Sequence, residues 1–190
     1  PGPVITPLTA GLVTDPDARA AWESRIPLGS IADGEQVAPR FRVRVASVDA
    51  YGAILNSYPS TRRTSSSAPD APWAVNLAGR DGAYRLLPFD FDAHEPALID
   101  EAAAAAIATR ALLEDAGFTT VLCESAPNGG RHLWTAAVDP IPATTVRRIA
   151  EAVKRLHPTL DTGALTNAAT GAMRPPGAPH RHGGHSRVLE

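Results

Sequence analysis

The chain has 190 residues, of which 44% are hydrophobic and 20% are charged, and its formal net charge is −2. These values are those of a globular protein, exclude a wholly disordered chain, and by themselves give no support to a nucleic-acid partner. The single cysteine, Cys123, excludes an intramolecular disulfide and a cysteine-built zinc site, and fits a reducing cytoplasm. No apolar run approaches the roughly 20 residues that span a bilayer. The chain begins with Pro1 rather than Met, so we expect a piece of a longer protein.

The N-terminal part, residues 1–80, is interrupted by Pro and Gly and holds one clear strand pattern. At residues 40–48 apolar residues alternate with arginines, which is the period-two pattern of a half-buried strand. A short helix is expected at residues 15–23, where an Asp precedes a Pro in the first turn. Residues 60–71 are rich in Ser, Thr and Pro, which predicts a surface loop.

The C-terminal part, residues 81–190, has sharper patterns. Ala, Leu and Glu dominate one predicted helix, β-branched residues the strand after it, and an Asn-Gly-Gly turn precedes the next strand. In chain order the pattern predicts strand, helix, strand, strand, helix and a last extended piece, at residues 84–92, 96–116, 118–124, 132–138, 142–156 and from 161 toward 174.

This order is β-α-β-β-α-β, which is typical of RRM-like and ferredoxin-like units. The predicted fold class is therefore α+β, with a single domain spanning residues 1–190. An RRM-like catalytic unit at residues 81–190 would pack with a smaller N-terminal α/β unit at residues 1–80, which carries the basic strand.

Strand order brings distant polar residues together in such a unit. The first strand lies between the third and the fourth and runs antiparallel to both, so its end meets their beginnings. Asp90 and Asp92 lie near the end of the first strand, His132 begins the third, and Asp161 begins the fourth. We expect these four side chains to converge on one edge of the sheet.

Asp90 and Asp92 have the spacing of paired ligands. Residues two apart on a strand point to the same face, about 6.6 Å apart along it, so both carboxylates face one way and Phe89 and Phe91 face the other. Two like charges this close call for a cation, and hard divalent ions such as Mg²⁺ and Mn²⁺ prefer carboxylate oxygens. The alternative is a pair of solvent-facing acids at a strand end.

A glycine pair precedes the predicted third strand. Gly129 and Gly130 allow the backbone to approach a ligand and leave N–H groups free for phosphate oxygens. Arg131 and His132 follow directly and add groups that bind phosphate. An ordinary hairpin turn followed by a histidine is the alternative.

The C-terminal segment offers further ligands. Asp161 is a candidate for a third metal carboxylate or a turn residue, and Arg174 and His180 are candidates for phosphate contacts. His180, His182 and His185 have a spacing that permits a zinc or nickel site, although no cysteine or nearby acid completes a tetrahedral set. A glycine-rich tail without a ligand is the other interpretation.

Three motifs in order carry a family resemblance. An Asp-x-Asp pair, then small-x-His, then hydrophobic-Asp, resembles the signature of the archaeo-eukaryotic primase superfamily. The Asn-Gly-Gly-Arg-His string and the Arg-x-Pro-Gly…His stretch resemble its primase-polymerase branch in phage, plasmid and bacterial replication proteins. Ala178 departs from the Ser common in the family, and the cysteines of a zinc-binding stem are missing. The matching residues are Asp90, Asp92, Gly130, Arg131, His132, Leu160 and Asp161.

The resemblance implies a nucleotidyltransferase that adds NTPs or dNTPs on a DNA template with two Mg²⁺ or Mn²⁺ ions and releases pyrophosphate. It implies Asp90, Asp92 and Asp161 as metal ligands and, with His132, as catalytic residues. It also implies a helicase domain in the full-length protein, and a bacterial or phage-infected cytoplasm as location. The nucleotide-binding residues that follow from it are Ser125, Asn128, Gly129, Gly130, Arg131, His132, Arg174 and His180.

Arginines in the N-terminal part are candidates for contact with the template backbone, although arginines on the wet face of a sheet often serve only solubility. They are Arg40, Arg42 and Arg44 on the predicted strand and Arg62 and Arg63 in the predicted loop.

Two other functions stay open. A replication-initiator or relaxase-like nuclease uses paired histidines and a tyrosine nucleophile. His180 and His182 are similar to such a pair, but the residue between them is charged, and Tyr51, Tyr58 and Tyr84 are in no helical context. A catalytically inert RRM-like module reads single strands by stacking bases on aromatic side chains. The chain has only three Trp, three Tyr and four Phe, and acids occupy the sheet face where stacking aromatics are expected.

Overall fold

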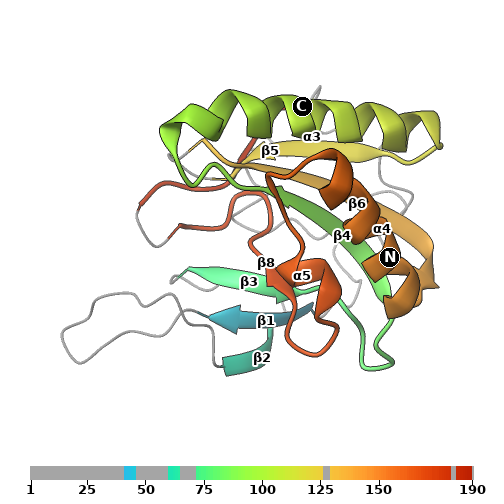
Figure 1. The fold of residues 1–190 in the computed structure, drawn as a ribbon. Coiled ribbons are helices and arrows are strands. Elements are labelled where there is room, and N and C mark those ends of the chain that lie inside the picture. Colours follow the sequence, from blue (N-terminus) through green and yellow to red (C-terminus); the bar gives the residue numbers. More distant parts are fainter. Residues whose placement is uncertain (1–40, 46–59, 65–71, 126–128, 181–182, 190) are drawn as a thin grey trace, which may run out of the picture.

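The computed structural model describes residues 41–45, 60–64, 72–125, 129–180 and 183–189. Within them the chain forms two sheets and several helices, so the predicted α+β class is confirmed in its general form (Figure 1). All strand pairs in both sheets are antiparallel. No helix in these ranges is long and apolar enough to cross a membrane.

The four-stranded sheet has the order β2-β1-β3-β8 and the five-stranded sheet the order β7-β4-β6-β5-β9. The first consists of β1 (Phe41–Val45), β2 (Ser60–Thr64), β3 (Trp73–Asn76) and β8 (Ala172–Met173). The second consists of β4 (Tyr84–Phe91), β5 (Thr120–Glu124), β6 (Arg131–Ile141), β7 (Leu160–Asp161) and β9 (Arg187–Val188). The helices are η1 (Pro96–Leu98), a 3-10 turn, followed by α3 (Ile99–Asp115), α4 (Ala143–Leu156) and α5 (Gly163–Thr166).

Helices α3 and α4 pack on the five-stranded sheet, α3 against β4, β5 and β6 and α4 against β4 and β7. The core beneath them combines large side chains from the strands with small ones from the helices, which lets the helices approach closely. Fully buried members are Phe89, Phe91, Leu133, Ala102, Ala106, Val146 and Ala150. This layer fixes the strands whose ends carry the polar residues.

The last predicted strand is wrong in its extent. Only Leu160 and Asp161 pair with β4, and the chain then turns into α5 instead of running on toward residue 174. The turn is local, because the Gly163 N–H donates to Asp161 Oδ1 at 2.7 Å. The chain next crosses to the other sheet, where β8 pairs with β3.

The prediction of a loop at residues 60–71 is also wrong for its first part. Residues 60–64 form β2, because a pairing partner, β1, overrides a composition that favours turns. Strands β3 and β9 were not predicted. The predicted helix at 15–23, and residues 40, 46–48 and 65–71, lie outside the described residues.

The boundary at residue 80 stays a prediction. The described strands show that the C-terminal segment contributes to both sheets, since β8 completes the four-stranded sheet and β9 the five-stranded one. The short connection between β3 and β4 is closed by a hydrogen bond from the Gly79 N–H to the Ala83 carbonyl at 2.8 Å. The two sheets are therefore linked by more than one passage of the chain.

Strand β6 provides a matched test of the core. Leu133 is 0% exposed and Val138 on the same strand is 72% exposed. We expect Leu133→Ala to lower the free energy of unfolding by about 3 kcal/mol, because it leaves a cavity, and Val138→Ala to change it by less than about 0.5 kcal/mol. Urea unfolding followed by circular dichroism measures both; equal effects would contradict the described packing.

Candidate metal centre

Strand register places two acidic side chains and one histidine in one row across three strands. Asp90 on β4 lies opposite His132 on β6 and opposite Asp161 on β7. Asp92 follows the end of β4 and stays attached to the segment before β7, since its N–H donates to the Thr159 carbonyl at 3.0 Å. The expected convergence of these residues from three strands is therefore present.

The three carboxylates form a compact group. One oxygen each from Asp90, Asp92 and Asp161 lies within 4.8 Å of the others, with Asp161 exposed and the other two half-buried. Among the His, Cys, Asp and Glu residues that the structure describes, these three are the ones close enough together to hold a metal ion. Oxygen donors of this kind suit a hard divalent cation such as Mg²⁺ or Mn²⁺.

His132 lies beneath the group rather than beside it. Its Nε2 is 3.3 Å from Asp90 Oδ1, and its side chain is 2% exposed. The other ring nitrogen, Nδ1, is buried without a hydrogen-bond partner. Asp90 Oδ1 is likewise buried without a hydrogen-bond partner, so the imidazole and the carboxylate are neighbours at ion-pair distance with no hydrogen bond between them.

Burial and the neighbouring carboxylates together raise the pKa of Asp92. Burial is the largest cause that raises it, and the carboxylates of Asp90 and Asp161 raise it further, to about 6. His94, whose Nε2 is 3.7 Å from Asp92 Oδ2, and His132 act in the opposite direction. A cation bound between these carboxylates would reduce their mutual repulsion.

The glycine pair packs against the end of β4. Gly129 has φ +84° and lies so close to Ile99 that an added Cβ would be 2.8 Å from Ile99 Cγ1. An added Cβ at Gly130 would be 3.3 Å from the Phe91 carbonyl oxygen. The hairpin closes through the Ser125 N–H, which donates to the Gly130 carbonyl at 2.9 Å. A side chain at Gly129 would be strained by the positive φ and by close approach, whereas one at Gly130 would require the neighbouring backbone to shift by a few tenths of an ångström.

Arg131 is engaged with its own hairpin. Its Nη1 donates to the carbonyls of Gly129 and Gly130 at 2.6 and 3.2 Å and lies 4.0 Å from Glu124 Oε1. Glu124 also accepts from Arg187 of β9, at 2.8 Å from Nη2. The predicted contact of Arg131 with a triphosphate would need this side chain to leave these partners.

Arg174 is anchored to the other end of the hairpin. It donates to the Ser125 carbonyl at 2.9 Å and to Ser125 Oγ at 3.0 Å. His180 lies in a C-terminal hairpin in which its N–H donates to the Gly184 carbonyl at 2.9 Å. Ala178, at the Ser position of the resembling family, is fully buried in that hairpin.

Some predicted residues are only partly described or not described. Asn128, Arg40 and His182 lie outside the described residues. On the four-stranded sheet, Arg42 is opposite Arg63 in the register of β1 and β2. In the same register Arg62 is opposite Val43 and Arg44 opposite Thr61.

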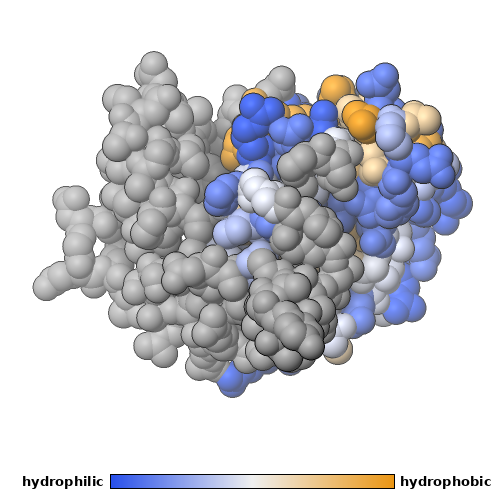
Figure 2. Space-filling model, turned by 90° about the vertical axis from the view of Figure 1, so that its left-hand side faces the viewer, coloured by the Kyte–Doolittle hydropathy of each residue, from blue (hydrophilic) through white to orange (hydrophobic). Residues whose placement is uncertain are grey.

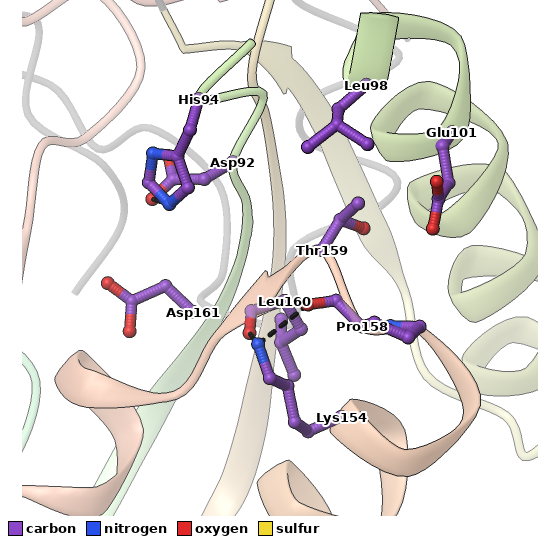
Figure 3. Close-up of a pocket in the computed structure, with 9 residues that line it drawn as sticks. All are labelled: Asp92, His94, Leu98, Glu101, Lys154, Pro158, Thr159, Leu160 and Asp161. Atoms are coloured by element: carbon purple, nitrogen blue, oxygen red, sulfur yellow. Dashed lines mark hydrogen bonds and ion pairs between the residues drawn. The ribbon is translucent and has the colours of Figure 1, made fainter.

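A pocket of about 420 Å³ opens beside the carboxylates, and Figure 3 shows Asp92 and Asp161 on one side of it and Glu101 on the other. Figure 2, which views the side of the molecule where α3 begins, shows mostly hydrophilic described residues.

Sequence reasoning missed His94, although it stands two residues after Asp92, and it gave Lys154 no role. The complete lining is Asp92, His94, Leu98, Glu101, Lys154, Pro158, Thr159, Leu160 and Asp161.

Two buried groups are unsuited to nucleophilic chemistry. Burial raises the pKa of the Cys123 thiol to about 12, and the residue is fully buried opposite His132. Burial likewise raises the pKa of Tyr84, whose hydroxyl is buried without a partner. Both groups are neutral at physiological pH.

No family model and no curated protein matches the chain. Among solved structures, the chain is similar to the polymerase domain of ligase D from Mycobacterium tuberculosis in complex with DNA. The TM-score is 0.52 and the identity 16%, and the match covers 87% of this chain and 71% of that chain. At this identity the likeness concerns the fold alone: this chain is folded like that polymerase domain.

Proposed function

We propose that this protein is a DNA-templated nucleotidyltransferase of the primase-polymerase kind, which joins NTPs or dNTPs and releases pyrophosphate. The observation that carries the proposal is the group formed by Asp90, Asp92 and Asp161, with His132 opposite Asp90 in the strand register. The similarity of the fold to a polymerase domain supports the same conclusion. The assignment of β4, α3, β5, β6, α4 and β7 to an RRM-like catalytic unit is part of this proposal.

The chemistry proposed here needs carboxylates at this place. Phosphoryl transfer to a hydroxyl group is promoted when two divalent cations, about 3.5–4 Å apart, neutralise charge on the attacking and leaving oxygens. Asp90, Asp92 and Asp161 would hold such ions, Mg²⁺ or Mn²⁺, through their oxygens. His132, whose Nε2 lies 3.3 Å from Asp90 Oδ1, would stabilise the charge of that carboxylate and contact the incoming nucleotide.

The triphosphate would lie on the His132 side of the carboxylates. There the Gly129–Gly130 backbone, Arg131 and Arg174 would supply donors. Ser125 links the two segments, because it accepts from Arg174 and its N–H donates to the Gly130 carbonyl. Arg131 would exchange its hairpin carbonyls for phosphate oxygens. Asn128 and His180 complete the proposed nucleotide-binding set.

DNA would contact the chain on the four-stranded sheet. Arg42 and Arg63, which are opposite each other in the register of β1 and β2, are candidates for contact with its phosphate backbone. Arg40, Arg44 and Arg62 belong to the same proposed template surface. A helicase domain in the full-length protein, and work on DNA in the cytoplasm of a bacterial or phage-infected cell, complete the proposal.

The alternatives find less support in the described residues. A tyrosine-dependent nuclease would not use Tyr84, because its hydroxyl is buried and neutral, whereas Tyr51 and Tyr58 lie outside the described residues. A stacking module needs exposed aromatic side chains on its sheet, but Phe89 and Phe91 are fully buried. The exposed large hydrophobic side chains in these ranges are all aliphatic.

The direct test is incubation with a single-stranded template, labelled dNTP or NTP, and Mg²⁺ or Mn²⁺, with and without a primer. We expect Asp90→Ala combined with Asp92→Ala to reduce incorporation by about a thousandfold or more, because the ligands for the cations are lost. The fold should persist, since the change removes mutually repelling charges. Asp139→Ala, an exposed acid on β6, is the matched control and should keep full activity.

Incorporation that persists in the double variant at the wild-type rate would remove the catalytic assignment. Circular dichroism and thermal unfolding of the same samples separate this result from loss of the fold.

Acidification should weaken the binding of Mn²⁺. A cation binds the ionised carboxylate, and the pKa of Asp92 is about 6, so we expect the affinity to fall about tenfold per pH unit below pH 6. The metal-free fold should show the opposite trend, since a raised carboxyl pKa means that stability is lost as the pH rises from about 4 through 6. Calorimetric titration and thermal unfolding across this range measure both; a pH-independent affinity would contradict the assignment.

His132→Ala should raise the KM for the incoming nucleotide and lower kcat, because a predicted phosphate contact and the support of Asp90 are lost together. We expect a fall in kcat/KM of about a hundredfold. Steady-state kinetics measure this change, with Cys123→Ser as a control at the neighbouring buried position in register. Unchanged KM and kcat in the His132 variant would take this residue out of the site.

A further inference from the structure

The third carboxylate stands on the weakest element of the five-stranded sheet. Strand β7 has two residues, Leu160 and Asp161, and lies at the edge of the sheet with β4 on its inner side. An edge strand this short has few ladder hydrogen bonds to fix it. Contacts outside the strand pairing therefore contribute to the position of Asp161; one is the hydrogen bond from the Gly163 N–H to Asp161 Oδ1 at 2.7 Å.

The carbonyls before Asp161 alternate between two partners. The middle one, of Thr159, points to β4 and accepts from the Asp92 N–H at 3.0 Å. The carbonyls on either side of it, of Pro158 and Leu160, accept from Lys154 Nζ at 2.7 and 2.6 Å. The ammonium group thus occupies the outer edge of this segment, where a further strand would otherwise pair (Figure 3).

Lys154 reaches this position from a rigid support. It lies in the last turn of α4, which is anchored in the core by Val146 and Ala150. Leu160, between the two bonded carbonyls and Asp161, is itself fully buried. Lys154 is the only lysine in a chain with 17 arginines, and a compact ammonium can donate to two carbonyls of one strand edge without the planar geometry of a guanidinium.

We propose that Lys154 is a positioning residue for Asp161, which fixes the spacing of the three carboxylates and so sets the affinity of the centre for a divalent cation. This inference rests on the metal centre of the proposed function. Lys154 also lines the pocket beside Asp92 and Asp161, so its charge acts on the centre as well as its hydrogen bonds.

Lys154 can act on the metal centre through its hydrogen bonds or through its charge, and the two effects predict changes of opposite sign in Mn²⁺ affinity when Lys154 is replaced. A positive charge near a cation site repels the cation, so its removal alone would tighten metal binding. Loss of the two hydrogen bonds would free the segment before Asp161, and a ligand that must be ordered on binding lowers the affinity. The sign of the change in Mn²⁺ affinity therefore shows which role Lys154 has.

The test compares Lys154→Met, which keeps the aliphatic stem, with Arg155→Met, which removes the same charge from the same helical turn. Calorimetric titration with Mn²⁺ at pH 7.5 should give about tenfold weaker binding for Lys154→Met, and unchanged or tighter binding for Arg155→Met. In incorporation assays, Lys154→Met should need about tenfold more Mn²⁺ for half-maximal rate and should regain most of the wild-type kcat at saturation.

Hydrogen exchange of the metal-free proteins supplies a readout that needs neither metal nor activity. In Lys154→Met the Asp92 amide, bonded to the Thr159 carbonyl, should exchange at least about tenfold faster, while amides in β6 keep their rates. Lys154→Gln, which retains an amide donor on a shorter stem, should give intermediate values and takes the place of the methionine variant if that variant does not fold.

Unchanged or tighter Mn²⁺ binding by the Lys154 variants, or unchanged exchange at Asp92, would overturn the proposal and leave the proposed function standing. If the wild-type protein binds no Mn²⁺, the metal centre itself fails. The exchange rates then still decide whether Lys154 fixes the segment before Asp161.

Discussion

Mutual repulsion among three carboxylates is the constraint on which the rest of this structure depends. Asp90, Asp92 and Asp161 have oxygens within 4.8 Å of one another, and the pKa of Asp92 is raised to about 6 by burial and by its two neighbours. Such a group forms only where favourable packing elsewhere in the fold outweighs the free-energy cost of this repulsion. The stabilising layer lies on the opposite face of the same strands, where Phe89 and Phe91 are fully buried beneath the helices.

The inner part of the centre could be predicted from sequence because it follows from strand periodicity. Alternation places Phe89 and Phe91 in the core and the two acids on the other face, whatever the rest of the chain does. The strand order of a β-α-β-β-α-β unit then predicts that His132 and Asp161 meet Asp90, and the register shows both contacts. The first step uses a local rule, and the second uses an order of elements that can be predicted along the chain.

The surroundings of the centre could not be predicted, because they depend on long-range partners. Residues 60–64 have a turn-like composition and become a strand only because β1 is available. The chain after Asp161 bends into α5 through a hydrogen bond to Gly163, and nothing in an Asp-Thr-Gly string distinguishes this bend from the start of a strand. Lys154 acts on backbone carbonyls, which carry no sequence signal.

At this edge of the sheet three carboxylates repel one another unless a cation binds, and the strands hold them close enough together to bind one. Crystals grown with Mn²⁺ and measured by anomalous X-ray scattering at the manganese edge test this account most directly. The account predicts an anomalous peak within coordination distance, about 2.0–2.6 Å, of oxygens from Asp90, Asp92 and Asp161. Density that shows the three side chains apart from one another, or manganese bound only elsewhere on the protein, would contradict it.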